Sequence, residues 1–247
     1  MMRIHIPDDA PPVLRSSAVW PELAARADLV YHDTLPGSEE GLIARIADAE
    51  AVLNIRASSR FTDRVMAACP RLRLISVWGT GTDHVDLEAA WRRGIAVRNT
   101  PGVSAISIAE HTLALLLAAA RRIPWADAAT RRGEWPRGQS VELNGKTCGV
   151  IGLGAIGTRF ARLAAGVGMR VVAWTMHPRT IPGIEMVELD DLYQRSDVVS
   201  VHLRLSPRTE GMIGAAQLAL MKPGAILINT ARGAIVDEAA LVEALET

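Results

Sequence analysis

Three glycines in the middle of the sequence have the spacing of a phosphate-binding turn. Gly152, Gly154 and Gly157 form the pattern G-x-G-x-x-G directly after an apolar run. The first would let the chain turn sharply, the second would let the backbone approach a pyrophosphate, and the third would let the next helix lie close to its strand. Unpaired N–H groups at the start of that helix favour an anion. The pattern predicts a dinucleotide site, although a plain strand-to-helix turn also uses glycines.

A second chemical candidate is Arg232, which follows an apolar run near the C-terminal end of the sequence and is followed at once by Gly233. Held at a strand end, its guanidinium could pair bidentately with a carboxylate and polarise a carbonyl. An interdomain ion pair would also place an arginine there.

The residue that would meet the ribose bears on the choice of cofactor. A fold that prefers NAD places an acid about 20 residues past the glycines, where it holds the ribose 2′-OH. This sequence has Thr175 there, followed by His177 and Arg179. Because a carboxylate would repel a 2′-phosphate and these residues would not, we expect NAD or NADP, with NADP favoured. A solvated surface charge is the other interpretation of Arg179.

Two loops in the first hundred residues carry polar groups that could meet a substrate. Residues 56–60 begin with Arg56, and residues 78–86 read WGTGTDHVD. Gly79 and Gly81 would free backbone N–H groups to point at a carboxylate, although a plain turn would also use them. We expect His84 to be an imidazole on the rim of this loop.

The elements that must position these groups alternate along the chain. Short β-rich runs at residues 3–6, 27–31, 51–55, 74–77 and 95–98 are separated by amphipathic segments. This alternation predicts a parallel sheet with helices on both faces, which binds ligands at the carboxyl ends of its strands. A long helix over 104–121, ended by Pro124, and a polar stretch over 125–144 should follow. We place the boundary between a substrate domain, residues 1–100, and a dinucleotide-binding domain, residues 101–247.

The second half repeats the alternation, with strands at residues 147–151, 170–174, 197–203 and 225–229. A helix-like segment ending at Met221 lies before the last of them. In a doubly wound sheet of order 3-2-1-4-5-6, residues 225–229 should form the fifth strand.

Composition narrows the class of protein. Of the 247 residues 49% are hydrophobic and 22% charged, with 27 basic and 27 acidic residues, so nothing favours a nucleic acid or an acidic membrane as partner. We expect no signal peptide or membrane span and a cytoplasmic protein. Cys69 and Cys148 are expected to be reduced and buried, with neither a disulfide nor a metal site.

Several motifs together resemble the D-isomer-specific 2-hydroxyacid dehydrogenase family, which includes glyoxylate/hydroxypyruvate reductases and phosphoglycerate dehydrogenases. They are GKTCGVIGLGAIG, SIAEH, GTGTDHVD, VHLRLSPRT and LMKPGAILINTARGAIVDEAAL. The resemblance implies hydride transfer between NAD or NADP and a small 2-oxo or D-2-hydroxy acid. It also implies a doubly wound flavodoxin-like substrate domain, a Rossmann NAD(P)-binding domain, and usually a homodimer.

The resemblance implies roles for individual residues. Arg232 matches the arginine that binds the substrate and polarises its carbonyl. The implied cofactor contacts are Ala155, Ile156, Thr175, Leu203, Arg204, Thr209, Thr230 and Ala231. Contacts with the substrate carboxylate are implied for Arg56, Thr80 and Gly81.

The sequence departs from the family pattern at three points. Thr175 replaces the usual acid, and Arg204 stands where most members have proline. After VDEAAL the family continues to a glutamate, to a Pro-His motif with the acid/base histidine, and to a last strand, none of which occurs within 247 residues. We therefore expect an incomplete Rossmann domain that associates through an edge strand and reduces 2-oxo acids poorly. A non-catalytic NAD(P)-binding or partner-binding module, or an inactive truncated product, is the alternative.

Overall fold

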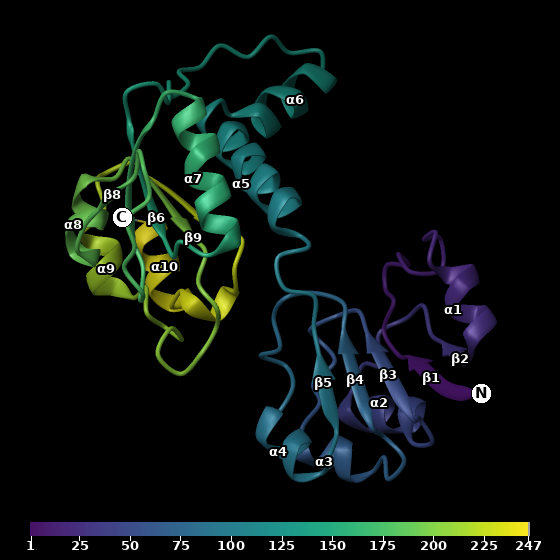
Figure 1. The fold of residues 1–247 in the computed structure, drawn as a ribbon. Helices are drawn as coiled ribbons and strands as arrows, with labels where there is room; N and C mark the ends of the chain where they lie inside the picture. The colour runs from purple at the N-terminus through teal and green to yellow at the C-terminus, as the bar shows by residue number, and fades with distance from the viewer. Residues whose placement is uncertain (247) are drawn as a thin grey trace. The chain divides into compact units, whose positions relative to one another are not determined.

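A computed structural model describes residues 1–246 and divides the chain into two compact units, Met1–Val103 and Ser104–Thr247 (Figure 1). Each unit holds a five-stranded sheet in which every pair of neighbouring strands is parallel. The predicted α/β class is confirmed.

The sheet of the first unit has the strand order β2-β1-β3-β4-β5. Its strands are β1 (Met2–Ile6), β2 (Ala27–Tyr31), β3 (Ala51–Asn54), β4 (Leu74–Val77) and β5 (Ala96–Arg98). This is the flavodoxin-like order, in which the direction of winding reverses between β1 and β3. Ligands of such sheets bind outside the carboxyl ends of the strands at that reversal.

Four helices cover this sheet: α1 (Trp20–Arg26), α2 (Glu39–Ile46), α3 (Asp63–Ala67) and α4 (Leu87–Arg92). The side chains of Ser38, Thr62 and Asp86 accept hydrogen bonds from backbone N–H groups in the first turns of α2, α3 and α4. These N-caps satisfy otherwise orphaned donors and set where each helix begins.

The second sheet has the order β10-β9-β6-β7-β8. Its strands are β6 (Thr147–Ile151), β7 (Arg170–Trp174), β8 (Glu185–Met186), β9 (Val198–Val201) and β10 (Ile226–Asn229). Every residue of β6 is buried, as expected of a central strand covered on both faces. β10 is the fifth strand in sequence, as predicted, and lies at one edge of the sheet among the described residues.

Helices of the second unit pack on both faces of this sheet. The helical elements of the unit are α5 (Ala105–Ala120), α6 (Ile123–Arg131), α7 (Ala155–Gly166), α8 (Leu189–Arg195), α9 (Ala215–Ala219), the 3₁₀ turn Gly233–Ile235 and α10 (Glu238–Glu246). Leu116 of α5 and Phe160 of α7 share a buried cluster with Val150 on one face of β6. Tyr193 of α8 packs with Ile151 in a second cluster. Within the described residues, no helix is long and apolar enough to cross a membrane.

The prediction for the segment after α5 is wrong in part. The long helix ends at Ala120, Arg122 adopts the left-handed φ of 54°, and Pro124 lies in the first turn of α6. A proline is tolerated there because the N–H it lacks would have no partner within the helix. The first part of the expected polar stretch is therefore helical. Together with the chain that follows it, α6 extends away from the sheet of the second unit (Figure 1).

Candidate functional site

The turn between β6 and α7 requires two of its three glycines for internal packing. Gly152 has a φ of 96°, and a Cβ there would lie 2.7 Å from the carbonyl oxygen of His202. A Cβ on Gly157 would lie 1.9 Å from the carbonyl oxygen of Gly152. Since real Cβ atoms do not approach so closely, only glycine lets α7 begin this close to the end of β6.

Gly154, the middle glycine, has open space beside it. Gly154 is the N-cap of α7, no side chain caps the helix there, and a Cβ on it would meet nothing within 4 Å. Ala155 and Ile156, which were expected to contact the pyrophosphate, are the first two residues of α7. An open space in front of a helix N-terminus is the cradle that an anionic group needs, so these residues fit a dinucleotide pyrophosphate.

His202, which directly follows β9, lies next to Gly152 of the turn. Its Nε2 is 2.9 Å from the Ser200 hydroxyl, and its ring centroid is 5.3 Å from that of Phe160. Burial lowers the pKa of His202 to about 4, because a charged imidazole would lose its hydration there. The neutral ring therefore acts as packing beneath the glycine turn.

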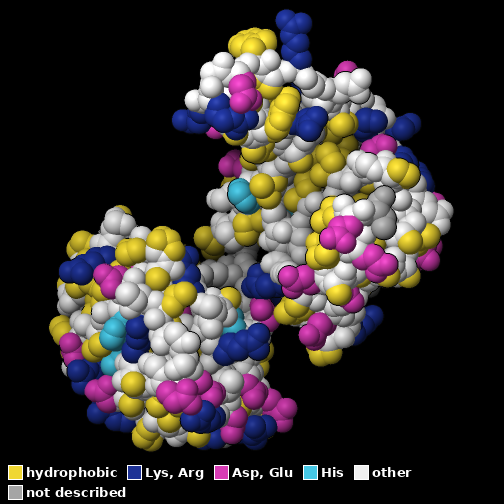
Figure 2. Space-filling view, turned by 180° about the vertical axis from the view of Figure 1, so that it is seen from behind, with side chains coloured by type: hydrophobic (Ala, Val, Ile, Leu, Met, Phe, Trp, Pro, Cys, Tyr) yellow, Lys and Arg dark blue, Asp and Glu magenta, His cyan; other side chains and the backbone are white. Residues whose placement is uncertain are grey.

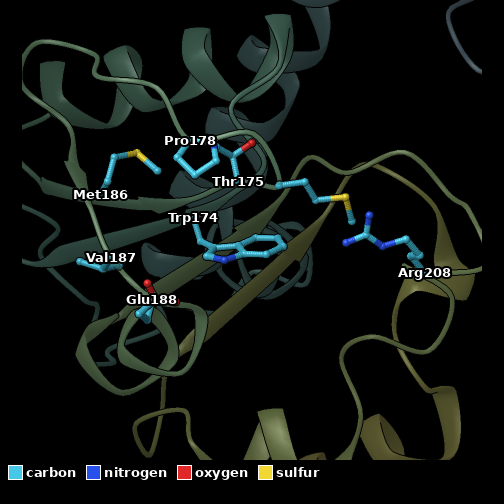
Figure 3. A pocket seen from close by; sticks show the side chains of 8 residues that line it. Trp174, Thr175, Pro178, Met186, Val187, Glu188 and Arg208 are labelled. Atoms are coloured by element: carbon cyan, nitrogen blue, oxygen red, sulfur yellow. The ribbon is translucent and has the colours of Figure 1, made fainter.

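A pocket of about 490 Å³ opens at the carboxyl end of β7 (Figure 3). Thr175, the residue expected to face the ribose, lines it together with Trp174 and Met186. Arg208 also lines it and was not among the predicted site residues. The sequence could have indicated Arg208, because it directly precedes Thr209 in a segment that was expected to contact the cofactor.

Arg179 does not line this pocket. Its guanidinium donates hydrogen bonds to the carbonyl oxygen of Leu153 and, over 2.9 Å, to the hydroxyl of Thr158. Arg179 is thus folded back onto the glycine turn.

The hydroxyl of Thr209 makes several of the hydrogen bonds that order the loop after β9. Thr209, 1% exposed, donates to the carbonyl oxygen of Arg204 over 2.7 Å and accepts from the N–H of Ser206 over 2.8 Å. Arg204 is exposed, and Leu203 is half-buried against Gly152. The cofactor contacts expected of these residues stay predictions, but the structure places the loop at the carboxyl edge of the sheet.

The turn after β10 is clamped by Asn229, which sequence reasoning missed. Its amide nitrogen donates to the Arg232 carbonyl oxygen over 2.8 Å, and its amide oxygen accepts from the Ala231 N–H over 3.0 Å. The hydroxyls of Thr230 and Thr112 are 3.0 Å apart, which ties the turn to α5. Because β10 is parallel to β9, and β9 to β6, Arg232 emerges at the same sheet edge as the glycine turn.

In the first unit a buried carboxylate organises the candidate substrate loop. Asp8, fully buried, accepts from the Asn54 amide over 2.6 Å and from the N–H groups of Ile55 and Arg56 over 2.8 and 3.3 Å. The Nε2 of His84 donates to the Asn54 amide oxygen over 2.7 Å. The prediction of a rim imidazole is wrong, because His84 is 6% exposed and belongs to this network.

The three predicted carboxylate contacts follow neighbouring strands of this sheet. Arg56 comes after β3, and its guanidinium donates to the carbonyl oxygens of Ala10 and Pro11 over 2.9 and 2.5 Å. Thr80 and Gly81 come after β4, and the Thr80 carbonyl oxygen accepts from the Asn99 amide over 2.6 Å. The structure thus brings these residues to one edge of the first sheet, as expected of parallel strands.

Comparisons with known proteins agree with this geometry. The family model of the D-isomer specific 2-hydroxyacid dehydrogenase NAD binding domain matches residues 113–247. The D-3-phosphoglycerate dehydrogenase of Methanocaldococcus jannaschii is 43% identical over 216 residues, which are 85% of this chain and 41% of the relative. The glyoxylate reductase of Aeropyrum pernix is 42% identical over 87% of this chain and 68% of its own length.

A solved structure is similar over nearly the whole chain. An acyclic imino acid reductase, Bsp5, in complex with NADPH and D-Arg superposes with a TM-score of 0.88 and 32% sequence identity, over 99% of this chain and 79% of that one. The chain spans less than half the length of the phosphoglycerate dehydrogenase it matches. Motifs, strand order and these matches all lead to one conclusion: the chain belongs to the D-isomer specific 2-hydroxyacid dehydrogenase family.

Proposed function

We propose that the whole protein interconverts a small 2-oxo acid and a D-2-hydroxy acid by hydride transfer, using NAD or NADP. The observation that carries this proposal is the open cradle at Gly154, which lies at the N-terminus of α7 and on the same sheet edge as Arg232. The names of the D-3-phosphoglycerate dehydrogenase and glyoxylate reductase relatives fit such an acid as substrate.

Different residues of the second unit would bind different parts of the cofactor. The first N–H groups of α7, at Ala155 and Ile156, would hold the pyrophosphate, and Thr175 would face the ribose. Thr230 and Ala231 would lie near the nicotinamide, held in place by the Asn229 clamp. When bound, the dinucleotide supplies or accepts the hydride. Because Thr175 carries no negative charge, the proposal favours NADP over NAD.

Arg232 would hold the carboxylate and draw electron density from the oxo group, because a guanidinium presents several donors in one plane. In this proposal residues 1–100 form the substrate domain, and Arg56, Thr80 and Gly81 hold the substrate carboxylate. A positioned acid is typically worth about 10²–10⁴-fold in rate when an alkoxide develops. The family resemblance implies a histidine paired with a glutamate as that acid. The proposal does not use His84 or His202 for this role, because the imidazole of each already contacts another side chain.

The proposed assembly is a homodimer built on the second unit. Its support is a run of exposed apolar side chains in and after α6, namely Ile123, Trp125, Trp135 and Val141. Hydrophobic side chains also gather on the second unit beside the protruding α6 segment (Figure 2). Contiguous exposed apolar surface commonly marks a protein interface. We also propose a cytoplasmic location, supported by the free and buried Cys69 and Cys148.

Turnover and binding measured together test the function. Titration with NADPH and NADH should show binding, and addition of glyoxylate or hydroxypyruvate to the whole protein should consume the reduced cofactor. Arg232→Gln should keep cofactor binding and lose at least about 100-fold in turnover, as for other lost transition-state donors. Binding without turnover in the whole protein would instead indicate a non-catalytic NAD(P)-binding module.

A further inference from the structure

We propose that Arg208, and not Arg179, is the residue that binds the 2′-phosphate of NADPH. The inference rests on the proposed function, because it names the specificity determinant of the same cofactor site. It assigns Arg179 to holding the glycine turn, where it would act on both cofactors alike.

The pocket at the end of β7 brings Arg208 and Thr175 together. Both line the same space of about 490 Å³, with Trp174 as part of its wall. Figure 3 shows Arg208 at one end of the pocket with its guanidinium turned toward Trp174. Thr175 directly follows β7, at the position that faces the 2′ oxygen of the ribose in this class of sheet. A phosphate on that oxygen would therefore enter the pocket that Arg208 lines.

Arg208 is the cation of this pocket. Of the other lining residues, Glu188 is acidic. The rest carry no charge; they are Trp174, Thr175, Met176, Pro178, Met186 and Val187. Guanidinium groups bind phosphate oxygens through two parallel N–H donors, which gives strong and directional contacts. Glu188 lies at the other end of the pocket from Arg208 in Figure 3. Its charge opposes a 2′-phosphate and leaves NADH nearly unaffected.

Arg208 also stands on an ordered loop. The neighbouring Thr209 hydroxyl, 1% exposed, bonds the Arg204 carbonyl oxygen and the Ser206 N–H. These bonds fix the backbone from which Arg208 reaches, so less conformational entropy is lost when its side chain meets an anion.

Arg179 is engaged elsewhere. Its guanidinium donates to the Leu153 carbonyl oxygen and to the Thr158 hydroxyl, and it is not among the residues that line the pocket. Leu153 lies in the glycine turn and Thr158 in the first part of α7, both beside the proposed site of the pyrophosphate, a group that NADH and NADPH share. Loss of Arg179 should therefore weaken the two cofactors to the same extent.

Equilibrium titrations of NADPH and NADH separate the two arginines without any need for turnover. Arg208→Ala should raise the dissociation constant of NADPH by at least about tenfold and change that of NADH by less than about twofold. Arg179→Ala should shift both constants by similar factors. Glu188→Gln should tighten NADPH and leave NADH unchanged, because it removes a repulsion that only the 2′-phosphate feels.

Controls keep the outcomes distinct. Arg131→Ala removes an exposed guanidinium of α6 and should alter neither constant. If Arg208→Ala does not fold, Arg208→Gln gives the same comparison. Equal effects of Arg208→Ala on both cofactors, or a selective loss of NADPH in Arg179→Ala, would overturn the inference and leave the proposed function standing. Failure of the wild-type chain to bind either cofactor would overturn both.

Discussion

The three glycines of the turn after β6 are required for two different physical reasons. Gly152 and Gly157 are fixed by the backbone oxygens that a Cβ would strike, so they serve the fold. Gly154 touches nothing within 4 Å, so the protein itself does not need a glycine there. A position that is free of internal constraint and faces a helix N-terminus is best explained by a ligand.

Gly154→Val should therefore abolish dinucleotide binding while the fold persists. Its backbone angles, φ −72° and ψ −165°, are open to residues with a side chain, so no strain arises in the free protein. Calorimetric titration should show no NAD(P)H binding, with unchanged circular dichroism. Gly166→Val, at the other end of α7 and equally free of contacts, is the matched control. Retained affinity in the folded Gly154→Val chain would refute the cradle.

The half-buried imidazole of His202 makes stability depend on pH. Its pKa falls from 6.5 to about 4 in the folded chain, so between these values the unfolded state binds more protons. The free energy of unfolding should then decrease as the pH is lowered from about 6.5 to about 4, by on the order of 3 kcal/mol from this group. Urea titrations at several pH values should show that the free energy of unfolding falls less steeply with decreasing pH for His202→Gln than for the wild type. Identical slopes would mean that this ring does not titrate as its burial requires.

The sequence was enough to predict which residues lie at strand ends, but not which residues hold them in place by hydrogen bonds. Arg232, Thr175 and the glycines follow apolar runs, and the carboxyl ends of parallel strands are where ligands bind. Asp8 and Asn54 are 46 positions apart, so their 2.6 Å hydrogen bond has no local signature. His84 looked exposed in a polar loop for the same reason, since its partner Asn54 belongs to a different strand.

At the level of elements, α7 lies against the end of β6 only because Gly157 has no side chain. Gly157→Ala would press a methyl group against the Gly152 carbonyl oxygen, 1.9 Å from the ideal Cβ position. Such overpacking against backbone should destabilise the second unit by about 3 kcal/mol. Chemical denaturation should show the loss relative to Gly166→Ala, which adds the same methyl group where nothing is near. Equal stability of the two variants would contradict the close packing described for this turn.

All strands except β8 were predictable as short β-rich runs, most clearly the fully buried β6 and β9 of the second sheet. β8 has only two residues, Glu185 and Met186, and such a short element leaves no periodic pattern. The α6 segment was misinterpreted for another reason. A proline favours the end of one helix and the start of the next about equally, and here the left-handed Arg122 separates the two.

On the scale of the whole molecule, each of the four buried clusters draws its residues from a single unit. We expect two unfolding transitions, because each unit holds its own core. NADPH at 100 times its dissociation constant should raise the free energy of unfolding of the second unit by about 2.7 kcal/mol. The transition temperature of the second unit should therefore rise, and that of the first unit should not change. Differential scanning calorimetry with and without cofactor measures this. One transition that shifts as a whole would contradict the independence of the cores.

The proposed dimer can be tested by measuring the molecular mass of the protein in solution. Trp135, 83% exposed, belongs to the apolar run after α6. Sedimentation equilibrium should show a dimer for the wild type and dissociation for Trp135→Arg, because a charge would be buried at the interface. Trp91→Arg replaces an equally exposed tryptophan, 80% exposed on α4, and should leave the mass unchanged. A wild-type chain that stays monomeric at high concentration would rule this interface out.

The position of Trp174 gives the molecule an optical property. Its indole lines the pocket at the end of β7, whereas Trp135 is largely surrounded by solvent. Emission from the pocket tryptophan should therefore be blue-shifted relative to that of the solvated one, and molecules that enter the pocket should quench it selectively. The chain thus carries an intrinsic fluorophore in the pocket proposed for the 2′-phosphate, so that binding there could be followed without a label.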